Sequence, residues 1–583
     1  MTDERPQAAD FEPDRDERTP RHVPEGGPEH AGARAKAPAS VRIDRRGWLR
    51  GAAMLTVGAL GARAAPAQDA ASSSAPETAA SGALAAASGG TDTSAQLESQ
   101  TRRVLRWAGP APADWVRPRA GVDHNVVIVG GGQSGVAIAY GLRRKGVGGV
   151  EVVDQAEPGQ AGIWRNIARM DQLRTPKTMP GPEGDNVALG FRAWYETLNG
   201  PEAFDGLDRI PTLAWADYLS WFQQTTGTNV RYGTRLVEIE PEGDVLRLHL
   251  ESDGAVRIET ARKLVLATGY AGAGGPNVPD FMRALPGDVW THTTGRIPVE
   301  ALGGKVVGVI GAGSNAFDAA AIALEAGAAE VHLFSRRSSI AYQGVPPQAA
   351  SRPRPQPAPQ PVDRGYPNVL ELACELPDVL RWRNFVLRER SIASVPLDSL
   401  DRAMAFDNVR IHLDTSLADV ELAQNGQVRA RAGRDTMRFD YLIAATGYRI
   451  DLGAQGELAR IDDLIARWGD RYAPAPGEED AGAAAHPYLG TGFEFLPRGE
   501  AGADFLRNIH CFNLAAALSF GIPVGDVPSM VDHPRLVTAI ARDLYLESVD
   551  MAAHERYFNM PAAAPQDPSP YERAVVGRVR EVA

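Results

Sequence analysis

The chain has 583 residues, 61 basic and 73 acidic side chains and a formal net charge of −12, so it lacks the basic surplus typical of nucleic-acid binding. Its two cysteines, Cys374 and Cys511, exclude a disulfide framework, a cysteine-built metal site and a CxxC redox pair. No run of about 18 apolar residues is present, so we expect no membrane-spanning helix. At this length we expect several domains, and we predict no metal site.

The first 120 residues differ in composition from the rest. Residues 1–44 are charged and aperiodic, which predicts a disordered leader. Residues 45–67 contain Arg45-Arg46, a short apolar stretch and small-residue cleavage sites, and resemble a twin-arginine signal peptide. We therefore expect the translocation machinery as a partner and an exported or periplasmic protein. The alternative is a cytoplasmic protein with a chance arginine pair. Residues 68–120 are expected to be a linker.

A glycine-rich turn follows the first strongly apolar run. Residues 126–129 (VVIV) predict a buried parallel strand, and residues 136–142 continue as an apolar helix. The intervening Gly-x-Gly-x-x-Gly spacing suits a pyrophosphate at the helix N-terminus. The next strand ends in an acid that is placed to accept hydrogen bonds from an adenosine ribose. We predict a dinucleotide site formed by Gly130, Gly132, Gln133, Ser134, Gly135 and Asp154.

A second fingerprint of this kind follows the apolar run 305–310 (KVVGVI), with alanine in the third glycine position. Here the next strand ends in two arginines. Guanidinium groups can clamp a 2′-phosphate that a carboxylate would repel. We predict an NADPH site formed by Gly311, Gly313, Ser314, Asn315, Ala316, Arg336 and Arg337. The alternative is a pair of solvated arginines after a strand.

Two dinucleotide sites, the first ending in an acid and the second in arginines, imply that FAD and NADPH are held face to face. The runs 263–270 (KLVLATGY) and 441–448 (YLIAATGY) are near-duplicates that would return the chain to a sheet. We assign cofactor contacts to Thr268, Gly269, Thr446 and Gly447. The predicted fold class is α/β, with two Rossmann-like dinucleotide-binding domains and the FAD domain split by the inserted NADPH domain. The expected boundaries are 121–270 and 441–550 for FAD, 271–440 for NADPH and 551–583 for a C-terminal tail.

With these motifs, residues 122–545 resemble the class B flavin-dependent monooxygenases. Three further segments carry the resemblance: 162–164 (GIW), 173–179 (LRTPKTM) and 215–219 (WADYL). The resemblance implies hydride transfer to FAD, followed by capture of O2 as a flavin peroxide that oxygenates a small-molecule substrate. Some members with this layout hydroxylate amino acids or purines such as urate.

The resemblance also implies several residues near the flavin. Gly162 and Trp164 match a Gly-x-Trp element, Lys177 lies in the Pro-Lys-x-x-Met segment, and Asp526 lies in a Gly-Asp pair that other flavoproteins use as a flavin contact. Each has a simpler alternative. Trp164 would also suit the core, and Asp526 would also suit the N-cap of the following helix.

Two residues are candidates for catalysis. Arg174 stands where flavin-containing relatives carry an asparagine, and a fixed cation there could stabilise developing negative charge. Its alternative is a salt-bridged surface arginine. His292 lies near the family's signature histidine, although Gly287 precedes it by one residue more than the signature allows, and the following tryptophan is absent. Its alternative is an ordinary loop histidine.

Three other functions compete with an NADPH-dependent flavin monooxygenase. A flavin disulfide reductase needs paired cysteines, which this sequence lacks. An NADPH oxidase or flavin reductase would use both sites and release only hydrogen peroxide. A non-catalytic flavoprotein module would turn over NADPH slowly with every substrate.

Overall fold

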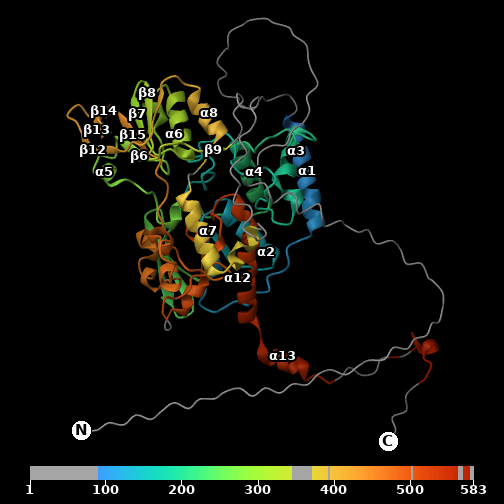
Figure 1. Cartoon of the computed structure of the whole chain (residues 1–583). Coiled ribbons are helices and arrows are strands. Elements are labelled where there is room, and N and C mark those ends of the chain that lie inside the picture. Colours follow the sequence, from blue (N-terminus) through green and yellow to red (C-terminus); the bar gives the residue numbers. More distant parts are fainter. Residues whose placement is uncertain are drawn as a thin grey trace, which may run out of the picture. The chain divides into compact units, whose positions relative to one another are not determined.

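The computed structural model describes residues 90–343, 370–391, 394–499, 503–561, 567 and 569–577. The expected leader (1–44) and signal segment (45–67), like the proline-rich stretch 351–361, lie outside the described residues. Figure 1 shows the chain coloured along its sequence.

The first sheet is built around the run that precedes the first fingerprint. Its six strands follow the order β2-β1-β5-β4-β3, with β16 also paired to β5. Strand β1 is parallel to both β2 and β5, and residues 126–128 are fully buried, as expected for a central strand. The strands are β1 (His124–Val129), β2 (Val150–Val153), β3 (Thr234–Glu242), β4 (Val245–Ser252), β5 (Ala255–Gly269) and β16 (Ile509–Asn513).

The second sheet repeats this arrangement around the second fingerprint. Its five strands follow the order β11-β8-β7-β15-β6, and every pair is parallel. They are β6 (Trp290–His292), β7 (Val306–Ile310), β8 (Glu330–Phe334), β11 (Val409–His412) and β15 (Tyr441–Ala444). Since its strands lie between β5 and β16 in sequence, the second domain is an insertion in the first. The predicted fold class is confirmed.

Two smaller sheets complete the described strands. An antiparallel sheet contains β12 (Leu417–Leu422), β13 (Val428–Ala432) and β14 (Asp435–Phe439), and a short parallel pair joins β9 (Tyr342–Gln343) to β10 (Val395–Pro396).

A helix covers each fingerprint strand. Helix α2 (Gln133–Arg144) packs against α12 (His533–Ser548) so closely that a Cβ on Gly141 would lie 2.9 Å from Val537. Helix α6 (Ser314–Glu325) contacts β7, β8 and α8 (Leu397–Met404), and Figure 1 shows α6 and α8 beside the second sheet. The other α-helices are α1 (Gly90–Ala108), α3 (Phe191–Asn199), α4 (Thr212–Thr225), α5 (Asp280–Arg283), α7 (Asp378–Arg390), α9 (Trp468–Arg471), α10 (Ala481–Ala484), α11 (Ala517–Phe520) and α13 (Met551–Phe558).

Three expected boundaries differ from the structure. Part of the expected linker 68–120 is the helix α1, which packs against α3 and buries Val104, because apolar residues recur there at helical spacing. Strand β15, expected to begin the second FAD segment at residue 441, pairs within the second sheet. Helix α7, expected in the NADPH domain, instead packs against α10 and α11.

Within the described part of the chain, no helix is both long and apolar enough to cross a membrane.

Candidate functional site

The first fingerprint is a turn that only glycine can form. Gly130 has φ +112°, and a Cβ there would lie 2.3 Å from the Ala267 carbonyl oxygen on the neighbouring strand. A Cβ on Gly135 would lie 1.8 Å from the Gly130 oxygen. The turn therefore brings α2 directly onto the end of β1 and leaves the first N–H groups of the helix facing outward, where an anion can bind.

The space in front of this helix is a cradle between two glycines. A Cβ on Gly132 would lie 3.3 Å from the Cα of Gly162. The segment 162–164 (GIW), which resembles the Gly-x-Trp element, therefore packs against the first fingerprint. Asp154 holds the turn: its Oδ2 accepts a hydrogen bond of 2.7 Å from the Gly131 N–H. Ser134, on the first turn of α2, is buried. Contact between Asp154 and a ribose stays a prediction.

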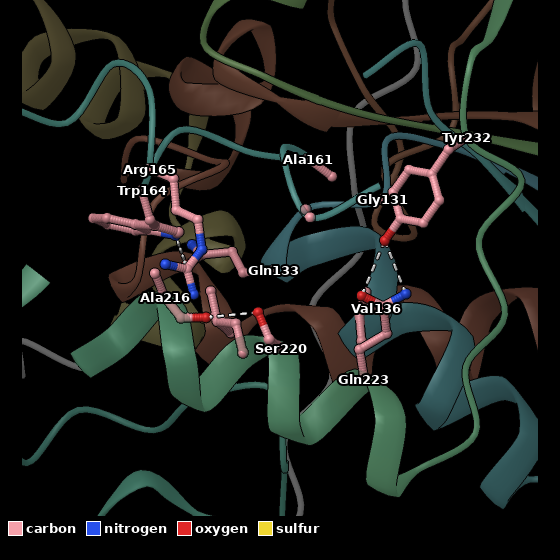
Figure 2. Close-up of a pocket in the computed structure, with 13 residues that line it drawn as sticks. Gly131, Gln133, Val136, Ala161, Trp164, Arg165, Ala216, Ser220, Gln223 and Tyr232 are labelled. Carbon is pink, nitrogen blue, oxygen red and sulfur yellow. Dashed lines mark hydrogen bonds between the residues drawn. The ribbon is translucent and has the colours of Figure 1, made fainter. Parts of the chain in front are cut away.

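Gln133 links the fingerprint to two tryptophans. Its Oε1 accepts hydrogen bonds of 3.2 Å from the indole N–H groups of Trp164 and Trp215, whereas its buried Nε2 has no partner in the described part of the chain. Figure 2 shows Gln133 beside Trp164, above the helix α4. Trp164 is both a core residue and a wall of this pocket, so both interpretations of it agree with its position. An unpartnered amide at the mouth of a glycine cradle suits a polar ligand.

The pocket continues toward the end of β2. It is lined by glycines of the fingerprint, by one face of α4 and by Tyr232, whose hydroxyl receives a hydrogen bond of 3.0 Å from Gln223. Figure 2 shows Tyr232 and Gln223 pointing toward each other across the pocket. The site therefore offers the unpartnered amide of Gln133, the space between Gly132 and Gly162, and the free N–H groups at the start of α2. Together these groups fit the pyrophosphate and adenosine half of FAD.

The second fingerprint has the same construction. Gly311 has φ +124°, and a Cβ there would lie 2.3 Å from the carbonyl oxygen of Ala445, the residue that follows β15. Nothing lies within 4 Å of a Cβ placed on Gly313, so the approach to the α6 N-terminus is open. Ala316, in the third position, is fully buried. Ser314 begins α6, and Asn315 is exposed on its first turn. The residues therefore fit a second dinucleotide.

The arginines after β8 differ in their partners. Both are exposed. Arg337 donates a hydrogen bond of 3.3 Å from Nη2 to the Ser391 carbonyl, and its backbone N–H donates to the Ser335 hydroxyl. Arg336 has no hydrogen-bond or ion-pair partner among the residues described. Of the two, Arg336 is thus the guanidinium available to a phosphate.

The ends of the two Ala-Thr-Gly-Tyr runs meet. The rings of Tyr270 and Tyr448 pack edge to face with centroids 5.3 Å apart. Thr268 accepts a hydrogen bond of 3.1 Å from Asn513, and Thr446 donates to the Asn277 carbonyl. Gly269 and Gly447 stand between each threonine and its tyrosine. Because β5 adjoins β1 and β15 adjoins β7, this contact joins the carboxyl ends of both sheets.

His292 is buried at this junction. Its Nδ1 accepts a hydrogen bond of 3.1 Å from the Thr294 N–H, and its ring lies 6.4 Å from that of Tyr448. Its buried Nε2 has no partner of ordinary hydrogen-bond geometry in the described chain. Burial lowers the pKa of His292 to about 4, although the nearby Gly447 backbone acts in the opposite direction. The imidazole is therefore neutral at pH 7, and its Nε2 is buried close to the Gly447 backbone.

Asp526 supports the same junction. Its Oδ2 accepts a hydrogen bond of 3.0 Å from the Tyr270 hydroxyl, and its Oδ1 accepts one of 3.3 Å from the Ser529 N–H at the start of the next helical turn. Burial raises the pKa of Asp526 to about 6. Asp526 thus binds the first turn of that helix from one residue before its N-cap, Val527, and the direct flavin contact stays a prediction.

Arg174 is salt-bridged, as its alternative interpretation expects. Its guanidinium forms an ion pair with Asp318, a buried carboxylate on α6, and donates weaker hydrogen bonds to Asn315. Burial raises the pKa of Asp318, while the charge of Arg174 opposes that shift. Arg174 thus joins the first domain to the first turns of α6. Nothing in this arrangement directs it at a reacting group.

Lys177 is also used within the protein. Its ammonium donates hydrogen bonds to the carbonyl oxygens of Phe204, Asp205 and Leu207 at 2.9, 3.1 and 2.5 Å. An ammonium has three N–H donors, so none remains for a cofactor. The expected cofactor contact is therefore replaced by a structural role that fixes the loop after α3.

The sequence motifs did not single out Asp318, the ion-pair partner of Arg174. Asp318 lies inside the apolar pattern of α6, and its polarity there is the one signal that it needs a partner.

Neither cysteine is suited to thiol redox chemistry. Both are free, and burial raises the pKa of Cys374 to about 11 and that of Cys511 to about 12. Both therefore remain thiols at pH 7, which disfavours a disulfide reductase. No group of three metal-ligating side chains occurs in the described ranges.

Comparison with known proteins agrees with this geometry. Residues 124–354 match the family model described as pyridine nucleotide-disulphide oxidoreductase. Among solved structures, the ornithine hydroxylase of Pseudomonas aeruginosa has a TM-score of 0.55 at 17% identity, covering 72% of this chain and 99% of that one. The L-lysine 6-monooxygenase of Pseudomonas syringae has a TM-score of 0.53 at 18% identity, covering 73% and 100%. These two likenesses show the fold.

A curated relative shows more. An FAD-dependent urate hydroxylase of Xanthomonas campestris pv. campestris is 37% identical over 463 residues, which cover 78% of this chain and 93% of that protein. The similarity includes nearly the whole relative, so it extends over both dinucleotide domains. With two glycine cradles and no cysteine pair, the chain belongs to the family of FAD-dependent monooxygenases that includes this urate hydroxylase.

Proposed function

We propose that this protein is an NADPH-dependent FAD monooxygenase that oxygenates a small, polar nitrogen heterocycle, with urate as the first candidate substrate. The observation that carries the proposal is the junction of Tyr270 and Tyr448, where the carboxyl ends of two similarly built dinucleotide sheets meet. Ligands of open α/β sheets bind at such ends. The name of the Xanthomonas relative supports urate.

Different residues would bind each of the two cofactors. The N-terminus of α2 and the cradle of Gly132 and Gly162 would hold the FAD pyrophosphate, and the N-terminus of α6 would hold that of NADPH. FAD, when bound, supplies hydride acceptance and activation of O2. At the junction, His292 stays neutral because burial lowers its pKa to about 4, and its ring packs against Tyr448, which in turn packs edge to face on Tyr270.

The test uses the full chain purified with FAD. NADPH consumption is followed with and without urate, and the product is analysed for one atom of ¹⁸O from ¹⁸O2. Urate-dependent NADPH oxidation with incorporation of ¹⁸O is expected. Consumption of NADPH that yields only hydrogen peroxide, with urate and with other nitrogen heterocycles, would show an NADPH oxidase instead.

The preference for NADPH is expected to depend on Arg336. Arg336→Ala should raise the KM for NADPH by about 10- to 100-fold, because a hydrogen bond to a charged group contributes about 1.5–3 kcal/mol. The KM for NADH, which has no 2′-phosphate, should change little. Steady-state kinetics with both nucleotides measure the difference. The additional change Arg337→Ala should enlarge it.

Arg296→Ala is the matched control, since Arg296 is exposed in the same domain and pairs with Glu300. It removes the same charge and should leave both KM values unchanged. An equal loss for NADH and NADPH in Arg336→Ala would remove the phosphate clamp from the proposal.

A further inference from the structure

Residues 169–174 of the first domain bind the second domain directly. The guanidinium of Arg169 donates hydrogen bonds of 2.6 and 2.5 Å to the carbonyl oxygens of Thr293 and Gly295, in the loop that follows β6. The Arg169 carbonyl accepts a hydrogen bond of 2.6 Å from Arg402 of α8. Because β6 pairs with β15 and α8 packs against α6, both contacts are made with the second domain.

The same segment is fixed to the first domain. The N–H of Leu173, a buried residue, donates a hydrogen bond of 2.8 Å to the Ile210 carbonyl, and the Asp171 carbonyl accepts one of 2.9 Å from the N–H of Thr212, where α4 begins. Trp164, a few residues earlier in the chain, lines the pocket in front of the first fingerprint. The segment therefore connects the proposed FAD pocket to the second domain.

The segment ends in the ion pair of Arg174 with Asp318. Asp318 is 2% exposed and lies among buried apolar residues of α6. A carboxylate in such surroundings needs a compensating charge, and Arg174 is its one ion-pair partner among the described residues. Arg174 also donates hydrogen bonds of 3.3 and 3.4 Å to Asn315, on the first turn of the same helix. The pair thus ties the start of α6, where the second pyrophosphate would bind, to the segment that leads from the FAD pocket.

We propose that Arg174 and Asp318 are a positioning pair that holds the second dinucleotide domain where the reduced nicotinamide can pass its hydride to the flavin. Both residues act through the position of α6, and neither contacts a cofactor. The hydride carries two electrons, so NADPH is oxidised to NADP⁺ and the flavin is reduced by the same two electrons. The inference rests on the proposed function for the identity of the two cofactors.

The size of the effect follows from the geometry of the transfer. The reacting atoms must approach to about 3–3.5 Å, and a misplacement of about 1 Å can lower a rate about 100-fold. Arg174→Met and Asp318→Asn should therefore each lower the limiting rate of flavin reduction about 10- to 100-fold. The affinity for the nucleotide should stay unchanged, because its binding groups lie on the second domain itself.

The experiment uses the full chain purified with FAD. Anaerobic stopped-flow bleaching of the flavin by NADPH gives the limiting rate of reduction. Titration of the oxidised protein with NADP⁺, followed by flavin absorbance, gives the nucleotide affinity without turnover, and the melting temperature monitors folding. Arg119→Met is the matched control, because it breaks an exposed ion pair with Asp244 inside the first domain. It should match the wild type in rate and affinity.

Two more variants separate positioning from stability. The double variant of Arg174→Met with Asp318→Asn should be no slower than the slower single variant, since each change already removes the pair. Arg174→Lys keeps the charge and should recover part of the rate. Asp318→Asn leaves no unpaired carboxylate in the core, so it tests the proposal even if Arg174→Met does not fold.

An unchanged limiting rate in Asp318→Asn, even with a lower melting temperature, would overturn the proposal and leave the pair a stabilising contact. Opposite effects on NADP⁺ binding, weaker in Arg174→Met and tighter in Asp318→Asn, would overturn it by making Arg174 a nucleotide ligand. The wild type tests the proposed function separately. Flavin that NADPH does not reduce would overturn the reductant together with the positioning role, whereas reduction without oxygenation of urate would overturn only the substrate assignment.

Discussion

Gly132→Val is expected to give a folded, colourless protein that no longer retains FAD. Gly132 has extended backbone angles that valine readily adopts, so the change adds only a side chain in front of the α2 N-terminus. That side chain would fill the cradle opposite Gly162 and keep a pyrophosphate from the helix N–H groups. Loss of two charge-assisted hydrogen bonds corresponds to at least about a 100-fold weaker binding of FAD.

The flavin content is measured from the absorbance ratio of the purified protein and by titration of the apoprotein with FAD. Circular dichroism and the melting temperature of the apoprotein establish that the chain is folded. A yellow Gly132→Val protein with normal flavin content would refute the first site. Gly287→Val is a suitable control, because Gly287 is exposed, has no positive φ and has nothing in the described chain within 4 Å of a Cβ.

Gly313→Val is expected to give the complementary result. The protein should be yellow, but NADPH should no longer bleach its flavin. Gly313 is the N-cap of α6, has extended backbone angles and has open space where a Cβ would stand. Valine would therefore cost the free protein little and would block the approach of a second pyrophosphate. The affinity for NADPH should fall by at least about 100-fold, with FAD content unchanged.

Anaerobic stopped-flow measurements of flavin bleaching against NADPH concentration test this. Dithionite should still reduce the flavin of Gly313→Val at the wild-type rate, which separates loss of nucleotide binding from damage to the flavin site. Normal bleaching by NADPH would show that the second fingerprint does not bind the reductant. Because the two glycines occupy equivalent positions, each variant is also the control for the other.

The sequence alone determined the two fingerprints, the strands that carry them and the insertion of one domain in the other. Each fingerprint depends on contacts within a strand, a turn and a helix, where steric limits on the backbone decide which residues fit. Gly130 and Gly311 could be assigned for that reason, and the structure places each against a carbonyl in or directly after the neighbouring strand. The export signal and the use of NADPH stay predictions.

Only the tertiary structure decided the partners of individual polar side chains. Arg174 and Lys177 belong to motifs near the expected flavin, but Arg174 pairs with Asp318 on a distant helix and Lys177 binds the loop after α3. The packing of apolar surfaces decides which oppositely charged groups and carbonyls lie near a charged side chain. The side chain then pairs with one of these groups. That packing joins segments far apart in the chain, and a local sequence pattern does not contain it.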